Sequence, residues 1–99
     1  MLNITKHSSG KNLELAIEGR LDTTTAPQLE EIVRNGLSGV ESLVFDFVKL
    51  EYISSAGLRV LLAAQKIMNK QGKMVVKNAS EEVKEIFEVT GFSDIMTIE

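Results

Sequence analysis

Residues 43–68 constrain the fold most, because a short buried segment runs almost directly into a long helical one. Residues 43–47 form an apolar run that is too short for a helix and suits a buried strand. Residues 58–68 contain good helix formers without proline or glycine. Between them stand Ser54 and Ser55, where a helix needs an N-cap. The stretch predicts a strand, a tight connection and a serine-capped helix.

The rest of the chain alternates short strand patterns with helical ones. Apolar and polar residues alternate over residues 2–4 and 13–17, and we expect these two segments to pair as a hairpin. Helices are expected over residues 25–38, 55–70 and 80–91, and further strands over residues 42–47 and 74–76. The apolar residues of 92–98 indicate a final docking segment or an edge strand. The order β-β-α-β-α-β-α-β predicts one α/β domain over residues 1–99, with helices packed against a mixed, mostly parallel sheet.

Two of the predicted helices have features that bear on the site. Thr25 and Gln28 have the spacing of a capping box at the start of the first helix. The second helix is apolar over about twice the ~100° arc that covers one face of a sheet, because Val60, Ala64 and Ile67 continue its inner surface. Either another helix packs against this flank, or part of it is a docking surface.

Composition excludes several classes of function. The formal net charge of −3 argues against nucleic-acid binding, and the absence of cysteine excludes thiol chemistry. No apolar run approaches the ~20 residues of a membrane span, and the first residues lack the core of a signal peptide. We therefore expect a cytoplasmic protein without membrane insertion.

Intrinsic catalysis is not expected. The single histidine, His7, lies near the opening turn and has no reason to approach Ser55. The chain lacks the Gly-x-Ser-x-Gly and Walker motifs, and its acidic residues show no spacing typical of a metal site. The prediction is a protein that is not an enzyme and needs no cofactor or metal.

Ser55 is a candidate substrate for a kinase. It is predicted to lie at a helix N-terminus beside Gly57, which would let another backbone approach closely. The helix dipole and free amides there would tolerate a phosphate of charge about −1.5 to −2. A docked partner would not tolerate it, because desolvating an unmatched dianion is costly. The alternative from the residues alone is a serine that only caps the helix.

Residues 46–58, Asp46-Phe47-Val48-Lys49-Leu50-Glu51-Tyr52-Ile53-Ser54-Ser55-Ala56-Gly57-Leu58, resemble the signature of STAS domains. The resemblance is to the bacterial anti-sigma factor antagonists of the sporulation and stress-response type. Gly19-Arg20-Leu21-Asp22 with Thr25, residues 72–76 and residues 83–92 also match that family's pattern. The resemblance covers nearly the whole chain.

The resemblance implies a switch between partners. Unphosphorylated antagonist binds an anti-sigma factor, itself a serine kinase of the histidine-kinase-like ATPase class, and frees a sigma factor. The kinase phosphorylates the serine that matches Ser55, and a PP2C-type phosphatase reverses this. Asp22 and Asp46 match acidic residues of the family. The resemblance implies that both lie beside Ser55, where they orient it or contact the partner; the alternative is that each has a purely structural capping role.

Three positions depart from the family's better-known members. Ser54 stands where these often have Asp, which makes it a second candidate phosphosite, and Ala56 stands where they often have Ser. Arg59 replaces a frequent small residue on the exposed side of the helix, and we expect it to tune partner choice. The predicted partner-binding residues are Asp22, Asp46, Ser54, Ser55, Ala56, Gly57 and Arg59.

Two other functions are compatible with the sequence. One is a non-phosphorylated STAS scaffold subunit of a signalling or lipid-transport assembly, in which Ser55 only caps the helix. The other is a small nucleotide-binding or hydrolysing protein.

Overall fold

The computed structural model describes residues 2–99, so Met1, the first residue of the predicted domain, lies outside it. Over those residues the chain forms a six-stranded sheet, three α-helices and one short 3-10 helix. The elements in chain order are β1 (Leu2–Ser9), β2 (Asn12–Leu21), α1 (Ala26–Gly36), β3 (Ser42–Asp46), β4 (Leu50–Ile53), α2 (Ser55–Met68), β5 (Lys73–Lys77), α3 (Glu81–Val89), η1 (Phe92–Asp94) and β6 (Thr97–Ile98). The predicted helices are confirmed to within two residues at each end.

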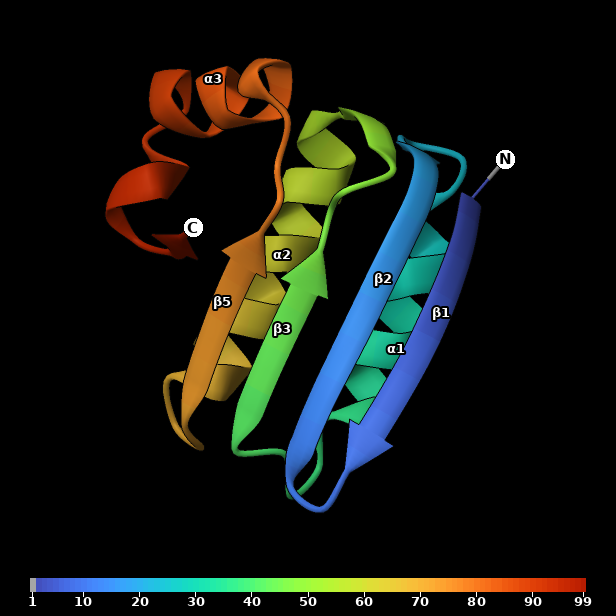
Figure 1. Ribbon diagram of the computed structural model, residues 1–99, viewed down its shortest axis with the longest axis vertical. Helices are drawn as coiled ribbons and strands as arrows, with labels where there is room; N and C mark the ends of the chain where they lie inside the picture. The colour runs from blue at the N-terminus through green and yellow to red at the C-terminus, as the bar shows by residue number, and fades with distance from the viewer. Residues whose placement is uncertain (1) are drawn as a thin grey trace.

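The sheet is mixed and mostly parallel, as predicted. Its strands lie in the order β1-β2-β3-β5-β6. β1 is antiparallel to β2, whereas β2–β3, β3–β5 and β5–β6 are parallel pairs (Figure 1). The opening hairpin and the α/β fold class are therefore confirmed.

β4 is the one strand that the sequence pattern does not indicate. The sequence predicts a connection at Leu50–Ile53, but these residues form a strand that pairs in parallel with the end of β2. β3 pairs with an earlier part of β2. Leu50 and Ile53 are both buried, three residues apart, with two exposed residues between them. That spacing departs from the period of two that identifies a strand, because the register shifts between Gly19 and Arg20 of β2.

The core lies between the sheet and the two longest helices. α1 and α2 run side by side across one face of the sheet, and α3 lies at the edge where β3 and β5 end (Figure 1). α1 packs against α2, and Val60 and Ala64 on the flank of α2 are buried. The wide apolar arc of α2 is therefore explained largely by its neighbouring helix, and Ile67 at its margin is half-buried.

All three helices begin at the same edge of the sheet, above the carboxyl ends of the parallel strands (Figure 1). In an open α/β sheet this edge is where ligands and partners usually bind. It carries both serines and both acidic residues singled out in the sequence.

Candidate functional site

Ser54 is the residue that caps α2. Its backbone is extended, with φ −98° and ψ 176°, and its hydroxyl accepts a hydrogen bond from the Gly57 amide at 3.4 Å. The Ser54 amide donates to the Leu21 carbonyl at the end of β2, and its carbonyl accepts from the Leu58 amide, both at 2.9 Å. The capping role considered for Ser55 therefore belongs to Ser54, which is fixed by the sheet on one side and the helix on the other.

Ser55 is the first residue of α2 and is exposed. Within residues 2–99 its hydroxyl makes no hydrogen bond. The amides of Ser55 and Ala56 belong to the first turn, where amides lack partners within the helix. No acidic side chain lies in this turn, so nothing on α2 itself balances the positive end of the helix dipole. The arrangement presents a free hydroxyl at an anion-tolerant position.

Gly57 has a different role from the one expected. It is buried, and a Cβ added there would lie 2.7 Å from Leu21 Cγ and 2.9 Å from Ile53 Cγ1. The glycine thus lets the first turn of α2 approach β2 and β4 of its own chain. The prediction that Gly57 opens the surface to another backbone is wrong, because the chain's own side chains occupy that space.

Asp22 organises the loop that leads from β2 into α1. Its Oδ1 accepts hydrogen bonds from the Thr24 hydroxyl at 2.8 Å, the Thr24 amide at 3.0 Å and the Thr25 amide at 3.2 Å. The Thr24 hydroxyl above all lowers the pKa of Asp22, because these donors favour the ionised carboxylate. The Asp22 carbonyl also accepts from the Ala26 amide at 2.8 Å, which fixes where α1 starts.

The capping box predicted for Thr25 and Gln28 is not formed. The Thr25 hydroxyl turns back and donates to the Arg20 carbonyl at 2.8 Å, while it accepts from the Asp22 amide at 2.8 Å. Thr25 makes no side-chain cap bond to α1, because its hydroxyl is bonded to the Arg20 carbonyl and the Asp22 amide instead.

Asp46 ties the end of β3 to the connection between β5 and α3. Its Oδ1 accepts from Asn78 Nδ2 at 3.0 Å and from the Val48 amide at 3.1 Å, and the Asn78 amide group above all lowers the pKa of Asp46. Its neighbours Phe45 and Phe47 are buried, so the Asp46 side chain points away from the helical layer that contains α2. Asp22 and Asp46 both have structural hydrogen bonds, and among the described residues neither bonds to Ser55.

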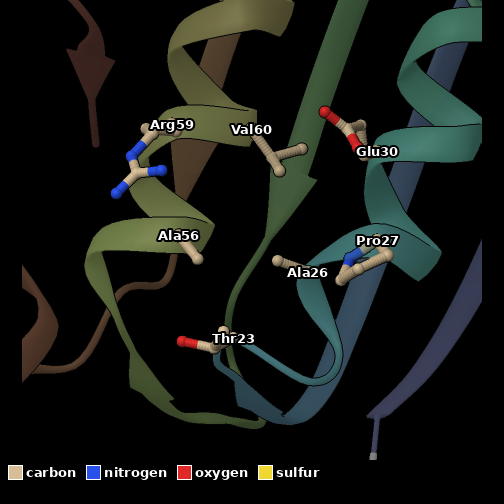
Figure 2. A pocket seen from close by; sticks show the side chains of 7 residues that line it. All are labelled: Thr23, Ala26, Pro27, Glu30, Ala56, Arg59 and Val60. Atoms are coloured by element: carbon tan, nitrogen blue, oxygen red, sulfur yellow. The ribbon is translucent and has the colours of Figure 1, made fainter.

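A shallow groove of about 210 Å³ lies beside Ser55, between the first turns of α1 and α2. Figure 2 shows Ala26 and Pro27 on one side and Ala56 and Val60 on the other, with Thr23 at the end of the groove. Glu30 and Arg59 are the charged residues on its lining. This form suits one or two side chains of a protein partner.

Sequence reasoning missed Val48 and Tyr52 as members of this edge. The Val48 side chain is 64% exposed, and the Tyr52 ring, 37% exposed, lies under the Arg20 guanidinium at 4.4 Å from its centroid. Val48 lies in the turn that follows β3, where the alternation of a strand no longer indicates which side chain is exposed. Tyr and Arg are typical of strong contacts in protein interfaces.

Three features that the sequence argues against are a histidine beside the serines, a metal site and a membrane-spanning helix. His7 pairs with Glu14 near the start of β2, whereas Ser54 bonds Leu21 at its end, so histidine and serines lie at opposite ends of the strand. Among residues 2–99 no three His, Asp or Glu side chains gather as metal ligands would. Nor do these residues include a helix with the length and apolarity needed to cross a bilayer.

The sequence of this chain matches a known family over almost all of the residues that the structure describes. The family model for the STAS domain matches residues 3–99, and the chain therefore belongs to the STAS domain family. BtrV of Bordetella bronchiseptica, named as an anti-sigma factor antagonist, is 38% identical over 84 residues, which are 83% of this chain and 72% of BtrV. The anti-sigma-B factor antagonist of Staphylococcus aureus is 28% identical over 99 residues, 98% of this chain and 92% of that protein.

Solved structures agree on the fold. The anti-sigma factor antagonist SpoIIAA from Bacillus, in its unphosphorylated form, aligns with a TM-score of 0.77 over 100% of this chain and 87% of its own, at 14% identity. Its phosphorylated form aligns with a TM-score of 0.76 over 100% and 91%, at 16% identity. At these identities the likeness establishes the fold alone.

Proposed function

We propose that this protein is an anti-sigma factor antagonist that is switched by phosphorylation of Ser55. Its unphosphorylated form binds an anti-sigma factor in the cytoplasm and thereby releases a sigma factor, and the phosphorylated form does not bind. The names of BtrV and of the S. aureus relative support the first part, and the two forms of SpoIIAA support the second. The protein needs no catalysis of its own for this role.

The observation that carries the proposal is that the two serines have different roles, since one caps α2 and the other leaves its hydroxyl exposed. Ser54 uses its hydroxyl to cap α2 and is half-buried, whereas Ser55 is exposed and its hydroxyl is free within residues 2–99. A kinase can therefore reach Ser55 without breaking a helix cap. Ser54, the second candidate acceptor, would have to give up its bond to the Gly57 amide.

The modification changes charge but need not change the fold. The γ-phosphoryl group of ATP passes to Ser55 Oγ: an Oγ–P bond forms, the bond from phosphorus to ADP breaks, and the hydroxyl proton is released. On a phosphatase, water attacks phosphorus and the Oγ–P bond breaks, which restores the hydroxyl and releases inorganic phosphate. The first-turn amides and the helix dipole favour the resulting dianion. The two forms of SpoIIAA match this chain almost equally well, which supports a switch without refolding.

A partner docked over this edge would lose affinity on phosphorylation. Covering a dianion with a partner surface that offers no cation leaves much of its desolvation uncompensated, at a cost of several kcal/mol. Each ~1.4 kcal/mol is a tenfold change in affinity. The groove lined by Ala56 and Arg59 and the loop built by Asp22 lie next to Ser55 in the proposed interface, with Asp46 on its far side. Gly57 contributes through packing.

The proposed enzymes are an anti-sigma factor that is a serine kinase of the histidine-kinase-like ATPase class and a PP2C-type phosphatase. The test is to incubate the purified protein with that kinase and ATP, and to map phosphate by peptide mass spectrometry. We expect modification of the wild type and of Ser54→Ala, and none of Ser55→Ala. Modification of Ser55→Ala as fast as the wild type would overturn the assignment.

A further inference from the structure

We propose that Arg59 binds the phosphate of phosphorylated Ser55, one turn back on the same helix. The inference rests on the proposed function for the identity of the modified residue, and it adds the group within the chain that recognises the modification. In this account Arg59 is a positioning residue of the switch.

The geometry of α2 places the two side chains together. Residues four apart on a helix are neighbours on one face, and side chains lean toward the helix N-terminus, so Arg59 reaches back over Ser55. Both residues are exposed. Figure 2 shows Arg59 on the outer side of α2, with its guanidinium directed back toward the first turn. An anion followed by a cation four residues later is also the favoured order for a helical ion pair.

Arg59 has no competing partner among residues 2–99. Glu30, the acidic residue on the same groove, is paired with Arg34 on α1 at 3.5 Å. Arg20, the other arginine at this edge, lies over Tyr52 and 4.0 Å from Asp22. The Arg59 guanidinium therefore remains available to a phosphate, which planar guanidinium groups bind through paired N–H donors.

Electrostatics favour the same contact. A cation in the second turn of a helix lies close to the positive end of the dipole, which is unfavourable unless an anion is present. α2 lacks an acidic residue in its first turn, so in the unmodified helix neither the positive end of the dipole nor the Arg59 guanidinium is compensated. A phosphate on Ser55 would compensate both. Phosphorylation would thus add a dianion to the edge and also withdraw Arg59 from contact with a partner.

The test uses protein into which phosphoserine has been incorporated at position 55 during translation. The proton affinity of the phosphate is measured by ³¹P NMR in a pH titration at 0.1 M salt, for the otherwise unchanged chain and for Arg59→Gln. If Arg59 binds the dianion, its removal raises the proton affinity by about threefold, as expected for an exposed ion pair. Phosphorylation should also raise Tm less in Arg59→Gln than in the unchanged chain.

The matched control is Lys66→Gln, which removes one positive charge from the same helix. Lys66 lies 11 residues beyond Ser55, roughly 16 Å along the helix and outside the screening length of ~10 Å. We expect this control to leave the titration unchanged. Equal titrations for the unchanged chain and Arg59→Gln, or an equal shift in Lys66→Gln, would overturn the proposal. The titration uses neither kinase nor partner, so its result does not depend on whether the proposed function is correct. The kinase assay tests that function separately.

Discussion

The first turns of α2 and α3 begin alike and differ at the next two residues. Ser54 and Ser80 each cap a helix from an extended backbone, with hydroxyl-to-amide distances of 3.4 Å and 3.2 Å. α3 continues with Glu81 and Glu82, whose charges suit the positive end of the helix. α2 continues with the neutral Ser55 and Ala56.

The difference shows what a capped helix start can be used for. The start of α3 is electrostatically complete, so a further anion there would be repelled. The start of α2 is capped but uncharged, so it is stable as it stands and can still accept a dianion. The functional position is therefore distinguished by the charge that is missing, since the capping chemistry is the same in both helices.

Adding a charge at α2 should have the largest effect, on binding. Ser55→Asp should weaken binding to the cognate anti-sigma factor by at least about 100-fold, because the carboxylate would be desolvated by a partner surface that offers it no cation. The thermal unfolding of this variant should match the wild type or improve slightly. Isothermal titration calorimetry measures the affinity, with Glu82→Gln on α3 as the control that leaves it unchanged. Wild-type affinity in Ser55→Asp would contradict the claim that a charge at the start of α2 controls partner binding.

Packing distinguishes the two helix starts at their third residue, which is Gly57 in α2 and the buried Val83 in α3. Gly57→Ala should destabilise the fold by about 1–3 kcal/mol, because the new Cβ would meet Leu21 and Ile53 at less than 3.0 Å. Gly36→Ala is the matched control, since its nearest neighbours would lie 3.7 and 3.8 Å away. Urea denaturation measures both. Equal stability of the two variants would mean that Gly57 is not packed as described.

Most of the fold was predictable, because hydrophobic periods identify elements whose partners lie nearby in sequence. The strand at residues 43–47 and the helix after Ser55 followed from the apolar run and the helix formers. β4 was not predictable, since its two buried residues depart from the strand period where β2 bulges. The role of Gly57 was not predictable, because only the assembled sheet shows that Leu21 and Ile53 fill the space beside it.

The site was predictable in its location but only partly in its detail. The Ser-Ser pair indicates a helix start, but a sequence does not show which serine has the extended backbone of an N-cap. Thr25 and Gln28 have capping-box spacing, yet the Thr25 hydroxyl bonds the Asp22 amide and the Arg20 carbonyl, while Asp22 binds the Thr25 amide. Tyr52 could not be assigned to the edge without β4, which brings it under Arg20.

Removing single serine hydroxyls should affect stability differently at Ser54 and Ser55, and similarly at the two cap residues, Ser54 and Ser80. Ser54→Ala and Ser80→Ala should each lower the free energy of unfolding by about 1 kcal/mol, because each leaves a first-turn amide without its acceptor. Ser55→Ala should change it by less than about 0.5 kcal/mol, as expected for an exposed side chain without bonds. Chemical denaturation of the three variants measures this. A larger loss in Ser55→Ala than in Ser54→Ala would reverse the assignment of the cap.

Exchanging first-turn charges should produce smaller changes of opposite sign. Ala56→Glu should stabilise the protein by roughly 0.5 kcal/mol, and Glu81→Gln should destabilise it by a similar amount, since an anion is favourable near a helix N-terminus. Both effects should shrink in 1 M salt. If thermal unfolding showed no stabilisation in Ala56→Glu, the start of α2 would not be the uncompensated one.

The smallest effect should be the pH dependence contributed by Asp46. Its folded-state pKa is lowered from 3.8 by the Asn78 amide, so its contribution is present above that pH and is lost as the pH falls below it. Asp46→Asn should therefore flatten the fall of stability below about pH 3.8. Urea denaturation between pH 5 and pH 2.5 checks this. An unchanged slope would show that the Asp46 bonds do not stabilise the folded state.

The measurement that tests the central claim most directly is mass spectrometry of the protein purified from its own cells. Intact masses and peptide masses are compared before and after phosphatase treatment, across several growth conditions. We predict a single removable phosphate, located on Ser55. Phosphate on Ser54, or no phosphate under any condition, would contradict the claim that α2 opens with a switchable serine.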